Sequence, residues 1–116
     1  MGSSRHTVLV VDDDDSMRML CRVNLDLAGY RVLEAPTVEE AAEALRGDRV
    51  DVVLLDVHVG SGDGFTVLDE VTTERVVLFT GSLEVTSVHR DRVDAVLNKP
   101  FTIDELHGTV AGLVAA

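Results

Sequence analysis

Short apolar runs alternate along this chain with longer stretches in which apolar residues recur every three or four positions. The apolar runs are not interrupted by polar residues, so both faces of each run are expected to be buried, as in parallel strands covered by helices on two sides. The spacing in the longer stretches predicts amphipathic helices. The strand-like runs are residues 8–11, 30–33 (the weakest), 52–55, 76–79 and 95–97.

Capping residues predict where the helices begin and end. The predicted helices are one from Asp14 or Asp15 to Gly29, one from the capping box at Thr37 to about Gly47, residues 65–71, residues 83–90, and one from the capping box at Thr102. The helix over residues 83–90 is the weakest of these, because it is rich in β-branched residues. Five strand–helix units in succession predict an α/β fold with a five-stranded parallel sheet, doubly wound, with helices on both faces.

Length and composition narrow the class of protein. A chain of 116 residues is expected to build one core, here residues 7–116, after a disordered or expression-derived segment, residues 1–6. The net charge of −11 argues against direct binding of DNA or RNA by this chain. No apolar run approaches the length needed to cross a membrane. Cys21 is the only cysteine, which excludes an internal disulfide, fits the cytoplasm, and favours a buried position for this side chain.

Polar residues that can carry chemistry stand directly after four of the apolar runs. Asp12 and Asp13 follow the first run, Asp56 the third, Thr80 the fourth and Lys99 the fifth. Because the carboxyl ends of parallel strands share one edge of a sheet, these side chains are expected to meet there. Three crowded carboxylates repel one another, and either raised pKa values or a hard cation such as Mg²⁺ would relieve that repulsion. With the ammonium of Lys99, the pattern predicts a metal-assisted site for a phosphoryl group.

The sequence resembles the receiver domain of bacterial two-component response regulators over residues 7–114. The motifs that carry the resemblance are Val10-Val11-Asp12-Asp13, Leu54-Leu55-Asp56, Asp63-Gly64, Phe79-Thr80-Gly81 and Lys99-Pro100-Phe101. The resemblance implies a flavodoxin-like fold in the cytoplasm and a phosphoryl donor that is a histidine kinase or a histidine phosphotransfer protein. It also implies a downstream effector, which these residues do not identify, and no enzymatic activity beyond self-catalysed phosphorylation and dephosphorylation.

The same resemblance implies a role for each residue of the expected metal site. Asp56 would be the phosphoacceptor and would hold Mg²⁺ (or Mn²⁺) together with Asp13 through carboxylate oxygens. Asp12 would act mainly through a metal-bound water, and the backbone carbonyl of His58 would be a further ligand. By contrast, Asp63 and the glycine after it are expected to be structural, as a turn and helix start.

The remaining family residues include both matches and departures. Lys99 would pair with the phosphoryl group, and Thr80 would move toward it. The family usually has proline where this chain has Gly60, alanine where it has Gly81, and an aromatic residue where it has Val96. The segments between these strand ends are also short for the family. We therefore expect a more mobile loop after the phosphoacceptor, and retained phosphorylation with an altered output surface.

Two other functions are compatible with these residues. A degenerate receiver would bind a partner without being phosphorylated, but the acidic pair, Asp56, Thr80 and Lys99 argue against it. A small metal-dependent phosphohydrolase of the haloacid dehalogenase type would use an Asp-x-Asp motif, and Asp12 and Asp14 have that spacing. The hydrophobic and threonine context of that motif is missing, and the chain is short for such an enzyme.

Overall fold

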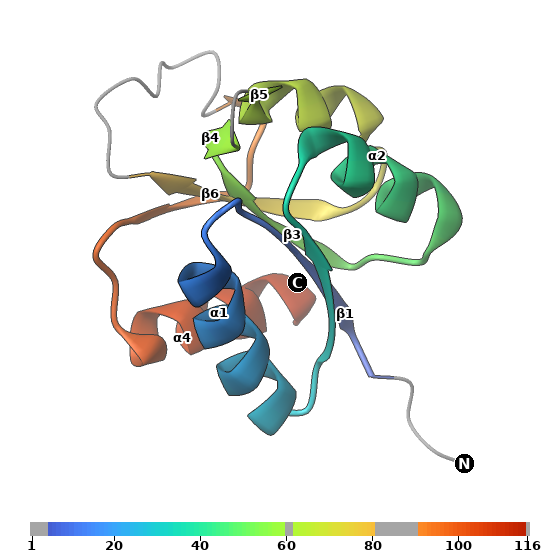
Figure 1. The fold of residues 1–116 in the computed structure, drawn as a ribbon. Coiled ribbons are helices and arrows are strands. Elements are labelled where there is room, and N and C mark those ends of the chain that lie inside the picture. The colour runs from blue at the N-terminus through green and yellow to red at the C-terminus, as the bar shows by residue number, and fades with distance from the viewer. Residues whose placement is uncertain (1–4, 60–61, 81–90, 116) are drawn as a thin grey trace.

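A five-stranded parallel sheet with the order β2-β1-β3-β6-β7 forms the centre of the structure (Figure 1). The computed structural model describes residues 5–59, 62–80 and 91–115. The strands of this sheet are β1 (Thr7–Val11), β2 (Arg31–Ala35), β3 (Val52–Asp56), β6 (Arg75–Thr80) and β7 (Ala95–Asn98). The chain adds β2 on one side of β1 and the later strands of this sheet, β3, β6 and β7, on the other side. The predicted doubly wound parallel sheet is therefore confirmed, with the reversal of strand order between β1 and β3.

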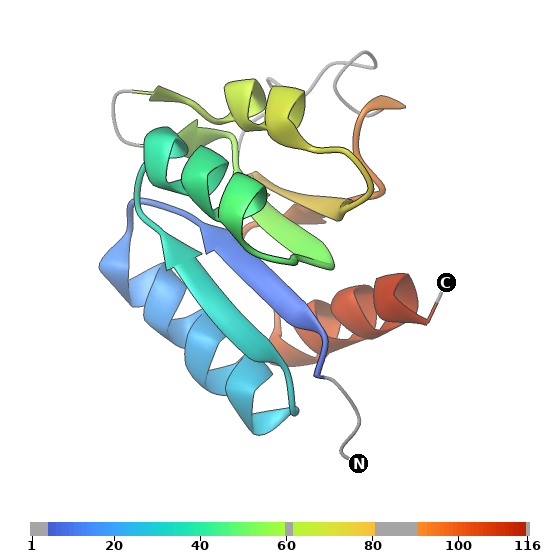
Figure 2. The same cartoon turned by 90° about the vertical axis from the view of Figure 1, so that its right-hand side faces the viewer.

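Helices cover both faces of the sheet (Figures 1 and 2). The helices α1 (Asp15–Leu27) and α4 (Ile103–Val114) lie on one face, and α2 (Val38–Gly47) and the 3₁₀ helix η1 (Gly64–Glu70) lie on the other. The longest of the described helices, α1, has 13 residues, and none of them is long and apolar enough to cross a membrane. The three layers account for the uninterrupted apolar runs, because each central strand is covered twice.

The core divides into two clusters, one on each face of the sheet. Along β1, Val8 and Val10 belong to the cluster under α1 and α4, whereas Leu9 and Val11 belong to the cluster under α2 and η1. This alternation follows from the two-residue period of a strand. Cys21 of α1 is fully buried in the first cluster, as predicted from its apolar neighbours.

The predicted capping residues mark the helix ends. Asp14 is the N-cap of α1, and its carboxylate accepts hydrogen bonds from backbone N–H groups in the first turn. Beyond the C-terminus of α1, Gly29 has a φ of 97°, a conformation that glycine adopts without strain. Thr37 caps α2, and the pair Thr102 and Glu105 forms a complete capping box at the start of α4.

Three local features differ from the sequence-based predictions. The third helix is a 3₁₀ helix and begins at Gly64, one residue earlier than predicted, in a short segment whose β-branched residues disfavour an α-helix. Strand β2 extends to Ala35 instead of ending at residue 33. A two-stranded antiparallel hairpin, β4 (His58–Val59) and β5 (Gly62–Asp63), follows β3 and was not predicted. The predicted helix over residues 83–90 and the predicted mobility at Gly60 fall outside the described residues.

Candidate metal centre at the carboxyl edge of the sheet

Three carboxylates from two strand ends meet at one point of the sheet edge. Asp12 and Asp13 directly follow β1, and Asp56 is the last residue of β3, the neighbouring strand. Each offers one carboxylate oxygen, and these three oxygens all lie within 4.8 Å of one another, so the group could hold a metal ion. The prediction that the distant carboxylates converge is therefore confirmed.

Lys99 brings a positive charge to this cluster from the end of β7. Its Nζ atom lies 3.2 Å from Oδ2 of Asp12 and 3.7 Å from Oδ1 of Asp56. The backbone N–H of Lys99 donates a 2.8 Å hydrogen bond to the carbonyl oxygen of Thr80, which ties β7 to the end of β6. One ammonium offsets only one of the three negative charges. A divalent cation would offset the other two, and hard carboxylate oxygens suit Mg²⁺ or Ca²⁺.

The three carboxylates differ in their access to solvent. Asp12 is 1% exposed; its Oδ1 accepts a hydrogen bond from the backbone N–H of Asp14 at 2.9 Å, and its Oδ2 accepts one from Lys99. Asp13 is exposed, and the side chain of Asp56 is 15% exposed. The buried carboxylate is thus fixed by hydrogen bonds, whereas the other two carboxylates are more accessible to solvent.

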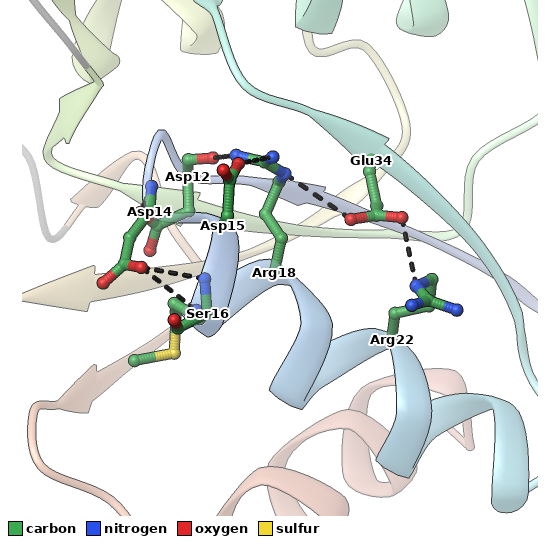
Figure 3. Close-up of polar contacts among 8 residues, drawn as sticks. Asp12, Asp14, Asp15, Ser16, Arg18, Arg22 and Glu34 are labelled. Atoms are coloured by element: carbon green, nitrogen blue, oxygen red, sulfur yellow. Dashed lines mark hydrogen bonds and ion pairs between the residues drawn. The ribbon is translucent and has the colours of Figure 1, made fainter.

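The next two acidic residues have structural partners outside the cluster (Figure 3). The Asp14 carboxylate accepts hydrogen bonds from the backbone N–H groups of Ser16 at 2.9 Å and Met17 at 3.4 Å. Asp15 forms an ion pair with Arg18. Negative side chains are favourable at a helix N-terminus, so these contacts explain the acidic run without catalysis. They also occupy Asp14, which the phosphohydrolase reading would require at the reaction centre.

Thr80 and Val96 lie on the last two strands of the sheet. Thr80 ends β6, at the same edge as the carboxylates, and is 3% exposed. Val96 of β7 is partly buried and packs against the core cluster under α2 and η1. No aromatic side chain occupies that position, as the sequence departure indicated. The hydrogen bond from Thr80 to a phosphoryl group stays a prediction, and Gly81 lies outside the described residues.

The backbone around Asp56 is packed against Gly64. A Cβ atom at position 64 would lie 2.0 Å from the carbonyl oxygen of Asp56 and 2.8 Å from that of Val57. The N–H of Gly64 also donates a 2.9 Å hydrogen bond to the carbonyl oxygen of Val57. The side chain of Asp63 caps η1 by accepting from the N–H of Phe65. The expected structural role of Asp63 and Gly64 is confirmed, and Gly64 additionally supports the strand end that presents Asp56.

The backbone of His58 lies in β4, two residues beyond Asp56. The proposed coordination of a metal by its carbonyl oxygen stays a prediction.

The Cys21 thiol is buried in the core near the site. Burial is the main cause that raises its pKa to about 12; the negative charge of Asp12 raises it further, and the positive charge of Lys99 lowers it. The native thiol is therefore protonated and unreactive at neutral pH.

One residue at the site was missed from the sequence. Nη1 of Arg18 donates a 2.7 Å hydrogen bond to the backbone carbonyl oxygen of Asp12. The i,i+3 spacing of Asp15 and Arg18 could have indicated their ion pair. The contact with Asp12, in contrast, depends on how α1 turns back against the end of β1, and no sequence spacing reveals it.

Comparisons with known proteins identify the family of this chain. The sheet order is that of the flavodoxin-like fold, and the family model of the response regulator receiver domain matches residues 8–111. The chain therefore belongs to the response regulator receiver domain family, which serves two-component signalling.

Two curated relatives illustrate the match in sequence. The alkaline phosphatase synthesis transcriptional regulatory protein PhoP of Bacillus subtilis is 28% identical over 114 residues, which cover 92% of this chain and 48% of PhoP. A transcriptional regulator of Haloferax volcanii is 36% identical over 116 residues, which cover 97% of this chain and 20% of that protein. This chain thus spans half or less of the length of these relatives.

Solved structures show the same fold. A response regulator from Chloroflexus aurantiacus is 28% identical, with a TM-score of 0.86 and coverage of 97% of this chain and 100% of that chain. The chemotaxis protein CheY4 of Vibrio cholerae is 25% identical, with a TM-score of 0.83 and coverage of 95% and 99%. A response regulator from Burkholderia pseudomallei, solved with a phosphorylated aspartic acid and a calcium ion, is 21% identical, with a TM-score of 0.78 and coverage of 93% and 66%.

Proposed function

We propose that this chain accepts a phosphoryl group on Asp56 from a histidine kinase or a histidine phosphotransfer protein, with Mg²⁺ or Mn²⁺ bound beside it. The observation that carries the proposal is the convergence of the carboxylates of Asp12, Asp13 and Asp56 within 4.8 Å, with the Lys99 ammonium beside two of them. Membership of the receiver family and the phosphorylated aspartic acid of the Burkholderia structure support the same chemistry.

The proposed reaction transfers one phosphoryl group between two side chains. A carboxylate oxygen of Asp56 attacks phosphorus and forms a new P–O bond, while the P–N bond of the phosphohistidine breaks. The electron pair of that bond stays on the imidazole nitrogen, and the product on Asp56 is an acyl phosphate. Lys99, already 3.7 Å from Asp56, would neutralise charge on the transferred oxygens, and the hydroxyl of Thr80 would donate a hydrogen bond to one of them.

The metal would be held by the three carboxylates gathered at the sheet edge and by one backbone carbonyl. Asp13 and Asp56 would bind it through carboxylate oxygens, Asp12 through a water molecule, and His58 through its backbone carbonyl. When bound, Mg²⁺ supplies positive charge to the phosphoryl oxygens and aligns donor and acceptor. The buried, doubly hydrogen-bonded carboxylate of Asp12 suits a role in orienting such a water molecule.

The acyl phosphate would be lost by in-line attack of water at phosphorus, which restores the Asp56 carboxylate. The chain would thus catalyse only its own phosphorylation and dephosphorylation, as a signalling module of the cytoplasm formed by residues 7–116. Its output would pass to an effector, either joined to this chain or separate from it. The net charge of −11 favours a protein partner with a basic surface over a nucleic acid.

Phosphorylation by a small-molecule donor tests the proposal. The chain is incubated with a phosphoramidate or an acyl phosphate and Mg²⁺, and its intact mass is measured. The expected result is the gain of one phosphoryl group that requires the metal, is reversed by hydroxylamine, and is absent from Asp56→Asn. A native chain that stays unmodified, or an Asp56→Asn variant that is modified equally, would contradict the proposal.

Two further assays separate the alternatives. A degenerate receiver would not bind beryllofluoride in the presence of Mg²⁺, whereas the proposed function predicts saturable binding. A phosphohydrolase would turn over a generic phosphomonoester many times per molecule, whereas the proposed function predicts no turnover.

A further inference from the structure

We propose that Arg18 is a positioning residue for the metal centre, which it serves by anchoring the backbone that carries the acidic pair. This inference rests on the proposed metal-assisted function. Its primary observation is the 2.7 Å hydrogen bond from Nη1 of Arg18 to the carbonyl oxygen of Asp12 (Figure 3). The side chain of Arg18 is 13% exposed, so solvent competes little for this contact.

The Asp12 carbonyl lies just beyond the last residue of strand β1. Strand β1 ends at Val11, and the N–H of Asp12 makes a last 3.2 Å hydrogen bond to the carbonyl oxygen of Ala35 in β2. The carbonyl of Asp12 belongs to the peptide that links it to Asp13. Because a peptide is planar, the arginine that fixes this carbonyl also fixes the N–H of Asp13 and the direction in which the chain continues.

Asp13 is the ligand that depends most on this anchor. In the part of the chain that the structure describes, its carboxylate makes no hydrogen bond or ion pair, in contrast to the carboxylate of Asp12. Its place within 4.8 Å of the other two carboxylates is therefore set by its backbone and its rotamer. Releasing the Asp12–Asp13 peptide would let the Asp13 carboxylate drift away from a position suited to the near-ideal octahedral geometry of Mg²⁺.

Arg18 is itself held by two acidic partners, one on its own helix and one on strand β2. Its Nη2 pairs with Asp15 at the start of α1, and its Nε lies 3.5 Å from Oε1 of Glu34 in β2. The other oxygen of Glu34, Oε2, lies 3.2 Å from Nε of Arg22. One planar guanidinium thus serves three acceptors at once, which the single ammonium of a lysine could not do. The positive charges of the two arginines are balanced by the negative charges of Asp15 and Glu34. This group therefore has no net positive charge with which to take the place of the metal ion.

Positioning and simple electrostatics predict opposite effects for the loss of Arg18. Removing a cation near the acidic cluster, and leaving Asp15 and Glu34 unpaired, makes the site more negative and would tighten Mg²⁺ binding. Releasing the Asp12 carbonyl would instead weaken Mg²⁺ binding. Partners that orient metal ligands typically change metal affinity by about 10-fold to 100-fold. The sign of the change therefore distinguishes the two roles.

The test measures Mg²⁺ affinity of the unphosphorylated full chain by calorimetry for the native protein, Arg18→Ala, Arg18→Met and Arg22→Ala. Arg18→Met keeps the buried stem and removes only the donors, so it remains informative if Arg18→Ala is poorly folded. Arg22→Ala is the matched control, because among the described residues Arg22 shares the partner Glu34 but makes no hydrogen bond to Asp12. Thermal unfolding checks that each variant is folded.

The inference predicts about 10-fold weaker Mg²⁺ binding for both Arg18 variants and a change within about twofold for Arg22→Ala. Unchanged or tighter binding in the Arg18 variants would overturn the inference alone, and so would an equal loss in Arg22→Ala. A native chain that does not bind Mg²⁺ would overturn the proposed function as well. These two failures are distinguishable in the same titration.

Discussion

Adding one methyl group at Gly64 tests how closely the candidate site depends on its supporting backbone. In Gly64→Ala, the new Cβ would lie 2.0 Å from the carbonyl oxygen of Asp56, against the 3.0 Å below which real Cβ atoms essentially never approach a neighbour. Both nearest atoms are backbone oxygens, which cannot rotate away as a flexible side chain could. Overpacking of this kind costs about 1–3 kcal/mol, and we expect the upper end of that range for the loss in free energy of unfolding.

To relieve the clash, the backbone must shift where Gly64 packs against the strand end that presents Asp56. A displacement on the order of 1 Å at a reacting group can slow a reaction about 100-fold. We therefore expect Gly64→Ala to reduce the rate of phosphorylation by a small-molecule donor by about 10-fold to 100-fold while the variant remains folded.

Gly108 provides a matched control with the opposite expected sign. It lies in the exposed interior of α4, and a Cβ there meets nothing within 4 Å. Gly108→Ala should stabilise the chain by about 0.5–1 kcal/mol, because alanine is the better helix former. Urea unfolding followed by circular dichroism measures both variants. A free energy of unfolding for Gly64→Ala within about 0.5 kcal/mol of the native value, a change typical of a surface substitution, would refute this expectation.

Three further predictions concern the charge, the core and a helix end. Lys99→Ala removes the cation beside Asp12 and Asp56. Calorimetry should therefore show several-fold tighter Mg²⁺ binding, while phosphorylation becomes slower. Weaker metal binding would show that Lys99 does not compete with the metal. The pKa of Cys21 is raised from 9.0 to about 12, so folding favours the protonated thiol. The contribution of the protonated thiol to stability is complete below pH 9.0 and is lost as the pH rises toward 12. A thiol reagent at pH 8 should therefore react with Cys21 only at the rate at which the chain unfolds. Rapid labelling of the native chain would contradict this. Thr102→Ala removes the capping box of α4 and should cost about 1 kcal/mol, or roughly 4 °C in melting temperature, and an unchanged melting temperature would be inconsistent with it.

Much of the fold follows from local patterns in the sequence. The apolar runs that became β1, β3 and β6 are buried on both faces, so the hydrophobic effect alone specifies them as central strands. Asp14, Thr37 and Thr102 cap helices through contacts with residues two or three positions away, which a sequence displays directly. The convergence of the carboxylates followed from one geometric rule about the carboxyl ends of parallel strands.

The features that were missed depend on how neighbouring segments of the chain fold back against one another. The short hairpin of β4 and β5 contains only two residues in each strand, too few for a hydrophobic pattern. The bond from Arg18 to the Asp12 carbonyl requires the turn between β1 and α1, and the close approach of Gly64 to Asp56 requires η1 to pack over the end of β3. An arginine that binds a backbone carbonyl looks in sequence like any exposed helical arginine.

A crystal structure of the chain with Mg²⁺ and beryllofluoride would show whether separate strand ends gather one cation around Asp56. We predict the metal bound by carboxylate oxygens of Asp13 and Asp56 at about 2.1 Å, with beryllium bonded to a carboxylate oxygen of Asp56 and one of its fluorides contacted by Lys99. A metal bound elsewhere, or Asp13, Asp56 and Lys99 pointing away from one another in such a structure, would contradict it.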